Sequence, residues 1–184
     1  MTLNSADLKE VESMNRFFLL VAFICITGCS SWLNREVELK RFPIDSLDGI
    51  IIQLGVQIDK QISSDGHGSL RITATEPRTV QLFEIKDVNV ENAKLIYRAQ
   101  VRTENLKGQI YMEIRCHFPN KVELFSRRRL TQMMGTEDWT KQEAVYYLAN
   151  GMKPDNIKLN LIINGTGTVW IDDVRLLKGS LRKR

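Results

Sequence analysis

The chain has 184 residues, of which 43% are hydrophobic and 26% are charged, and its formal net charge is +4. This length suits one domain with a full core, and the small positive surplus is spread along the chain, which argues against a nucleic-acid partner. The sequence contains no Gly-x-Ser-x-Gly elbow, His-Glu-x-x-His pair, phosphate-binding loop or dinucleotide fingerprint, so we do not expect an enzyme.

The first element predicted along the chain is an export signal. Residues 17–26 are apolar and uncharged, and Arg16 precedes them. About ten residues are too few for a membrane-spanning helix, which needs about twenty, but they match the apolar core of a secretory signal. An ordinary signal peptide or a buried apolar segment would share this core. Because residues 1–13 are net acidic, we expect translation to start at Met14.

The predicted signal ends in Ile26-Thr27-Gly28-Cys29, which resembles the bacterial lipobox. In that motif the cysteine thiol accepts a lipid, and small residues before it let the processing enzymes approach the backbone. The resemblance implies that residues 1–28 are removed and that Cys29 carries the acyl anchor, palmitate among its chains, that holds the protein to a membrane of the cell envelope. Ser30 follows, where aspartate would retain a lipoprotein in the inner membrane. This favours the outer membrane, facing the periplasm or the cell surface.

The cysteines and histidines leave little for disulfides or zinc. Once Cys25 has left with the signal and Cys29 is acylated, Cys116 is the remaining thiol. We therefore expect no intrachain disulfide. His67 and His117 are the two histidines of the chain, which is a poor supply of zinc ligands.

After the signal, residues 29–45 are predicted to form a lipidated tether, residues 46–178 one domain, and residues 179–184 a basic tail. Within the domain, short runs of alternating or β-branched residues are separated by turn residues, which is typical of an all-β, two-sheet antiparallel β-sandwich. Residues 105–108 and 164–167 are among the predicted turns, the second as a tight hairpin joining the last two strands. The predicted strands span residues 49–57, 69–75, 79–85, 93–103, 109–118, 142–148, 157–163 and 168–177.

Period-two alternation gives each predicted strand one apolar and one polar face. Cys116 lies on an apolar face, so we expect it to be buried. The polar faces carry side chains able to bond sugar hydroxyls or stack on sugar rings. An alternative interpretation is that the solvent-facing side of an antiparallel sheet is charged by default. The candidate ligand-binding residues are Arg98, Gln100, Arg102, Tyr111, Glu113, Arg115, His117 and Asn160.

Four segments resemble the cenC-type carbohydrate-binding modules, which belong to the galactose-binding-like jelly rolls. They follow the order seen in that family and together cover about two thirds of the expected mature chain. The resemblance implies a jelly roll that binds a carbohydrate without catalysis, although a fold alone does not fix a function. The segments are residues 66–72 (GHGSLRI), 95–102 (LIYRAQVR), 136–140 (TEDWT) and 165–176 (GTGTVWIDDVRL).

Modules of this family commonly hold a structural calcium ion, which takes six to eight hard oxygen ligands. The resemblance implies Asp172 as the side-chain ligand, helped by carbonyls near His67 or Ser69 and by Asp45 or Asp48. This chain lacks the family's acidic N-terminal segment and offers Ser46-Leu47-Asp48-Gly49 in its place. The alternative is that Asp172 caps a strand end and accepts hydrogen bonds from turns.

The sequence therefore predicts a lipid-anchored envelope protein whose single β-sandwich binds a ligand, with a glycan as the first expectation. The alternative is a structural or protein-interaction module of an envelope or secretion assembly. In that case exposed aliphatic side chains such as Ile96 and Ile162 would form the contact with an envelope protein partner.

Overall fold

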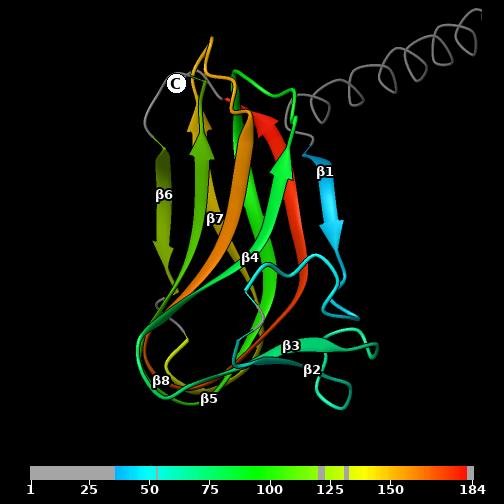
Figure 1. Ribbon diagram of the computed structural model, residues 1–184, viewed down its shortest axis with the longest axis vertical. Helices are drawn as coiled ribbons and strands as arrows, with labels where there is room; N and C mark the ends of the chain where they lie inside the picture. The colour runs from blue at the N-terminus through cyan, green and yellow to red at the C-terminus, as the bar shows by residue number, and fades with distance from the viewer. Residues whose placement is uncertain (1–35, 53, 120–122, 131–132, 182–184) are drawn as a thin grey trace, which may run out of the picture. The chain divides into compact units, whose positions relative to one another are not determined.

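The computed structural model describes residues 36–52, 54–119, 123–130 and 133–181. The predicted signal peptide, the start at Met14 and the lipidation site Cys29 lie outside these residues. The described strands are β1 (Val37–Phe42), β2 (Val56–Asp59), β3 (Ser69–Ala74), β4 (Arg78–Lys86), β5 (Ala93–His117), β6 (Leu124–Arg129), β7 (Gly135–Leu148) and β8 (Asn156–Ser180) (Figure 1). Within the described ranges, no helix has the length and apolar character needed to cross a membrane.

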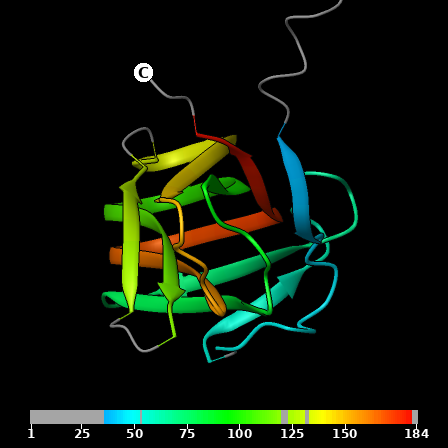
Figure 2. The ribbon, with the colours of Figure 1, turned by 90° about the horizontal axis from the view of Figure 1, so that it is seen from above.

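Two long strands organise the fold. β5 and β8 run antiparallel to each other along almost their whole length and form one ribbon. This ribbon bends over at one end of the molecule, so that its two halves lie in different layers (Figure 1, Figure 2). All strand pairs are antiparallel. The predicted two-sheet antiparallel β-sandwich is confirmed.

Each half of the ribbon is extended by its own neighbours. In the first layer, called here the β7 sheet, β7 pairs with the first half of β5, while β1 and β3 pair with the second half of β8. β2 adds to β3. In the second layer, called here the β4 sheet, β6 pairs with the second half of β5 and β4 with the first half of β8.

Glycines allow the ribbon to bend. Gly108 of β5 lies opposite Gly165 of β8, and a Cβ on Gly165 would stand 1.9 Å from the Lys107 carbonyl oxygen. Two backbones can approach this closely only where side chains are absent. The ladder shifts register between Glu104 and Lys107 at the same place, and such an irregularity increases the local bend.

The predicted hairpin at residues 164–167 is therefore wrong, as is the separation of two strands by residues 105–108. The chain does turn at both places, but each arm of β8 pairs with β5 rather than with the other arm. Gly and Asn in a sequence indicate that the chain changes direction. The same residues are compatible with a hairpin and with a single strand that bends from one sheet into the other.

Both ends of the domain extend beyond the predicted boundaries. Residues 37–42, assigned to the tether, form β1 on the edge of β8, and the ring of Phe42 stacks on Phe83 with centroids 3.7 Å apart. β8 continues to Ser180, past the predicted start of the tail. The run 49–57 is a strand only from Val56; before it, the N–H groups of Ile51 and Ile52 bond to carbonyls of β4.

β6 was not predicted, because three consecutive arginines within residues 124–129 hide its alternation. β7 begins at Gly135, so residues 136–140 lie in a strand rather than in the expected turn.

The core lies between the two sheets and follows the predicted alternation. Ile110, Met112, Ile114 and Cys116 of β5 are fully buried, and Leu159 of β8 packs with them. The prediction of a buried Cys116 is confirmed. The polar side chains of both sheets consequently face outward, on opposite surfaces of the sandwich.

Candidate functional site

The eight candidate ligand-binding residues do not form one face. Arg98, Gln100 and Arg102 lie on the first half of β5 in the β7 sheet, and the remaining five lie on the second half of β5 or the first half of β8 in the β4 sheet. Because β5 bends between Arg102 and Tyr111, the two groups point away from opposite sides of the core. The structure therefore does not bring the eight candidates together on one surface.

On the outer face of the β7 sheet, arginines are paired with carboxylates across strands. The guanidinium of Arg98 donates to Glu36 and Glu143 at 2.6 Å each, and Arg102 bonds Asp138 at 2.8 Å. Exposed pairs of this kind contribute about 0.2–1 kcal/mol each. They place a carboxylate beside both Arg98 and Arg102.

The indole ring of Trp170, which belongs to that surface, is covered. Trp170 is 2% exposed, and its indole N–H donates to Asp59 at 3.0 Å. The guanidinium carbons of Arg71 and Arg102 lie 5.7 and 5.8 Å from its ring. A ring with so little exposed surface offers no open platform to a sugar.

Glu113 is the centre of the outer face of the β4 sheet. Its side chain is fully buried, and it accepts hydrogen bonds from Asn160 at 2.9 Å, from Arg127 at 2.7 and 3.0 Å, and from Arg115 at 3.1 Å. Burial opposes ionisation, but the bonds from Asn160, Arg127 and Arg115 outweigh it and hold the pKa of Glu113 below its ordinary value. Glu113 is thus an ionised anchor that orients two arginines, rather than the ligand contact that the sequence suggested.

A second carboxylate continues this network toward the far end of the face. Glu123 accepts from Arg115 at 3.1 Å and from Lys158 at 3.0 Å. Beyond it, His117 contacts Asp155, Nδ1 to Oδ1, at 2.7 Å. His117 therefore lies at the end of β5 away from the bend, where its partner is a carboxylate of the same chain.

β6 adds an aromatic side chain that sequence reasoning missed. Phe125 lies opposite Arg115, and Arg127 opposite Glu113, in the β5–β6 register. The guanidinium of Arg127 stands 5.8 Å from the ring of Tyr111 and 5.3 Å from that of Phe125. Phe125 and Arg127 both face outward here because every second residue of a strand shares a face, but the three consecutive arginines concealed this alternation in the sequence.

A hollow of about 300 Å³ opens on this face at the bend end of the ribbon. Its size is at the lower limit of small-ligand pockets. Tyr111 and Ile162 are opposite each other in the β5–β8 register and give it an apolar side. The lining residues are Pro77, Arg78, Thr79, Tyr111, Arg127, Ile162, Ile163 and Asn164.

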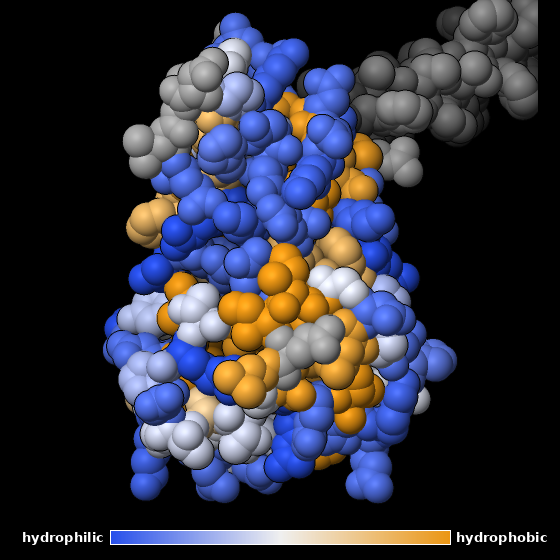
Figure 3. Space-filling view, in the orientation of Figure 1, coloured by the Kyte–Doolittle hydropathy of each residue, from blue (hydrophilic) through white to orange (hydrophobic). Residues whose placement is uncertain are grey.

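Exposed apolar side chains occur beside the hollow. Arg78 donates to the carbonyl oxygen of Leu54 and so holds the loop before β2 against β4. In that loop the side chain of Leu54 is 85% exposed and that of Ile51 is 44% exposed. Figure 3 shows hydrophobic residues gathered in the lower part of the surface turned to the viewer.

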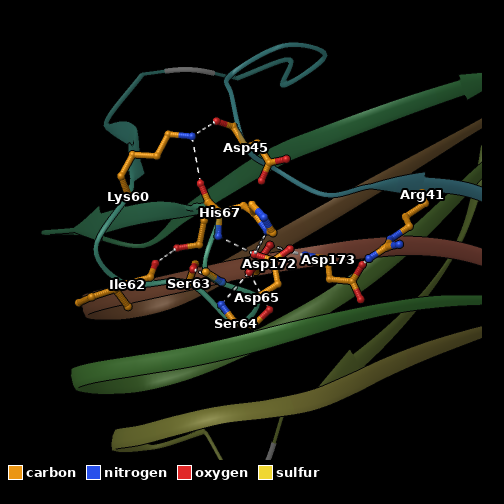
Figure 4. A network of polar contacts seen from close by, with 12 residues as sticks. Arg41, Asp45, Lys60, Ile62, Ser63, Ser64, Asp65, His67, Asp172 and Asp173 are labelled. Atoms are coloured by element: carbon orange, nitrogen blue, oxygen red, sulfur yellow. Dashed lines mark hydrogen bonds and ion pairs between the residues drawn. The ribbon is translucent and has the colours of Figure 1, made fainter.

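The residues expected to bind calcium are engaged with the chain itself. Asp172 is fully buried and accepts hydrogen bonds from the Ser64 amide at 2.8 Å, the Ser64 hydroxyl at 2.7 Å and the Asp173 amide at 2.7 Å (Figure 4). Burial raises the pKa of Asp172, although these hydrogen bonds act in the opposite direction. The hydroxyl of Ser69 donates to the Ile62 carbonyl.

Two of the backbone carbonyl oxygens in this region already accept hydrogen bonds from a lysine side chain. The ammonium of Lys60 donates to the carbonyl oxygens of Asp45, at 2.5 Å, and His67, at 3.1 Å (Figure 4). The carboxylate of Asp48 accepts a hydrogen bond from the Ser46 hydroxyl at 2.8 Å. Throughout the described residues, no three His, Cys, Asp or Glu side chains converge on a possible metal position. A calcium ion needs six to eight oxygens, and a fixed ammonium would repel it, so these residues do not fit one.

The sequence matches no family model and no curated protein. The structure does resemble solved ones. It aligns with the CBM22-1 xylan-binding domain of Paenibacillus barcinonensis Xyn10C at a TM-score of 0.57 and 14% identity, covering 79% of this chain and 97% of that one. It aligns with a family 16 carbohydrate-binding module at a TM-score of 0.53 and 13% identity, covering 71% and 91%. The fold is the galactose-binding-like jelly roll of carbohydrate-binding modules.

The same jelly roll also occurs in a Stig cyclase, FisC, from a Fischerella species. That chain aligns at a TM-score of 0.52 and 12% identity, over 84% of this chain and 93% of its own. Similarity of this degree establishes architecture, and function must be argued from the site.

Proposed function

We propose that this protein is a non-catalytic binding module whose ligand is a glycan, held on the outer face of the β4 sheet over Tyr111. The hollow beside Tyr111 carries the proposal, because it joins an aromatic ring and Ile162 to the guanidinium groups of Arg78 and Arg127. A pyranose has an apolar face that packs on rings and hydroxyls that accept from planar donors. Ligand sites combine these two features in this way.

Two further observations support this surface over the opposite one. On the β7 sheet, Arg98 and Arg102 are paired with carboxylates and Trp170 is covered, as described above. On the β4 sheet, Arg127 of the hollow also lies 5.3 Å from the ring of Phe125, which is 55% exposed. The structurally similar proteins also include two named as carbohydrate-binding modules, one of them a xylan-binding domain.

Affinity electrophoresis through gels containing soluble polysaccharides tests the proposal. We expect at least one polysaccharide to retard the wild-type protein, and Tyr111→Ala to weaken that binding about tenfold, which corresponds to about 1.4 kcal/mol. Tyr147→Ala is the matched control, because Tyr147 is 67% exposed on β7. Equal weakening by both variants, or no retardation by any polysaccharide, would rule out this assignment.

A protein-interaction module is the second candidate, and the exposed Leu54 and Ile51 favour it. Ile96, expected to contribute to such a contact, is buried at 1% exposure, and Ile162 lines the hollow instead. This alternative predicts a defined envelope partner that copurifies with wild type and with Tyr111→Ala but is lost with Leu54→Asp.

We also propose that the domain is tethered to the envelope through a lipid on Cys29, with the outer membrane as its location. The lipobox and Ser30 support this. Growth with an alkyne analogue of palmitate should label the wild-type protein, and Cys29→Ser should remove both the label and the membrane association. A labelled Cys29→Ser protein would contradict the proposal, and density-gradient fractionation of the membranes tests the location.

A further inference from the structure

We infer that the glycan held on the β4 sheet is acidic, carrying carboxylate or another anionic group on its sugars. This inference rests on the proposed function and specifies its ligand. The hollow beside Tyr111 is lined by two arginines, Arg78 and Arg127, and by no carboxylate among the described residues that form it. The lining alone therefore gives the hollow a positive potential.

The network of Glu113 and Glu123 on this face contains more cations than carboxylates. Glu113 and Glu123 together bond three cationic side chains, Arg115, Arg127 and Lys158. Within this network, two acidic groups for three basic ones leave one positive charge in excess.

Two further arginines add to this excess. Arg78 donates to the backbone carbonyls of Leu54, Gly55 and Thr73, which hold the guanidinium in place without neutralising it. Arg129 is exposed and lies opposite Tyr111 in the β5–β6 register, so both side chains are on the same face. Among the described residues, no carboxylate pairs with Arg129.

The two surfaces of the sandwich thus differ in how often their arginines are paired with carboxylates. On the β7 sheet, Arg98, Arg102 and Arg175 each contact at least one carboxylate within 4 Å. Around Tyr111, by contrast, Arg78 is held by backbone carbonyls and Arg129 is exposed, and among the described residues neither guanidinium is paired with a carboxylate. Guanidinium is planar and bonds carboxylate, sulfate or phosphate oxygens in pairs, and complementary charge mainly supplies specificity. A sugar ring packed on Tyr111 and Ile162 would place an acidic substituent within this cluster.

The experiment compares polymers that differ in charge and variants that differ in face. The full-length protein is run through gels of polygalacturonate, its carboxyl-reduced form, dextran sulfate, a phosphorylated dextran and plain dextran. We expect at least one anionic polymer to retard the protein more strongly than its neutral counterpart, and the retardation to fall as salt rises. Which polymer does so identifies the carboxylate, sulfate or phosphate.

Arg129→Gln tests the position of the site. This variant should bind the preferred polymer about tenfold more weakly, as expected for loss of one charge-assisted hydrogen bond. The matched control is Arg128→Gln. Arg128 is on the same strand as Arg129, but it lies opposite Met112 of β5 and therefore belongs to the other side of the sheet. Both residues are exposed, so neither change should prevent folding, and this is checked by thermal melting.

The outcomes separate the two proposals. Equal retardation by polygalacturonate and its carboxyl-reduced form, with none by the sulfated or phosphorylated polymer, would overturn the acidic ligand and leave glycan binding intact. Equal weakening by Arg129→Gln and Arg128→Gln would show non-specific attraction and would also overturn it. Absence of retardation by every polymer, charged or neutral, would overturn both.

Discussion

Replacement of Lys60 by methionine should loosen two loops at once. The Lys60 ammonium bonds the carbonyl oxygen of Asp45, in the loop after β1, and that of His67, in the loop between β2 and β3. Methionine keeps much of the unbranched side chain and loses both donors. A hydrogen bond from a charged group contributes about 1.5–3 kcal/mol when it is shielded. Because Lys60 is exposed, we expect about 1–2 kcal/mol for the pair.

That loss should appear as a lower melting temperature. For a domain of this size, 1 kcal/mol corresponds to about 2–4 °C, so Lys60→Met should melt about 2–8 °C below wild type. Lys86→Met is the matched control, because Lys86 is an exposed lysine of β4 with no side-chain partner among the described residues. Equal melting of the two variants would refute the role assigned to Lys60.

The same protein tests the calcium site. If the ammonium already holds the two carbonyls, millimolar calcium should leave the melting temperature of the wild type unchanged. A ligand present at a hundred times its dissociation constant would stabilise the fold by about 2.7 kcal/mol, which is a shift of several degrees that melting would readily detect. A rise of this size in calcium, reversed by a chelator, would show that our account of Lys60 is wrong.

Three further experiments, two by substitution and one by thiol labelling, test other parts of the structure. Glu113→Gln removes the charge that two arginines share and should cost about 2–3 kcal/mol in urea unfolding at neutral pH. Because the folded pKa of Glu113 is lowered, its stabilisation is present above the ordinary value of 4.5 and is lost as pH falls through the lowered value; a difference from wild type that persists in strong acid would contradict this. Gly165→Ala puts a Cβ 1.9 Å from the Lys107 carbonyl and should cost more than about 3 kcal/mol or prevent folding, whereas Gly179→Ala meets a flexible lysine side chain and should cost less than about 1 kcal/mol. Burial, assisted by a nearby carboxylate, raises the pKa of Cys116 to about 12, so a thiol reagent should modify it only in denaturant, and rapid labelling of the folded protein would disprove its burial.

Much of the fold followed from local patterns in the sequence. Alternation placed Ile110, Met112 and Ile114 in the core correctly, because a strand with one buried face must repeat every two residues. The same rule failed for β6, where Arg127, Arg128 and Arg129 are all exposed and no apolar partner marks the inner side. Edge strands often lack that mark, since one of their faces packs only partly.

The candidate site was harder to predict, because its composition depends on which sheet each half of β5 joins. Arg102 and Tyr111 have similar polar surroundings in the sequence but belong to different layers. The burial of Glu113 was also hidden, since a carboxylate on a polar face is buried only when partners such as Arg127 fold over it. Alternation shows which side of a strand a residue faces. The sheet to which that part of the strand belongs is set by pairing between distant segments.

The bent ribbon of β5 and β8 has a consequence for how the protein folds. Each of these strands contributes to both layers, so neither layer is complete until residues far apart in the sequence have paired. Bringing such distant residues together costs chain entropy before their contacts contribute stabilising free energy, so folding is slow. Neither layer contains a strand set that stands alone, so partial unfolding into one intact sheet is disfavoured and the domain should open in a single cooperative step. We therefore predict that substitutions at Gly108 or Gly165, where the two backbones approach closely, slow folding.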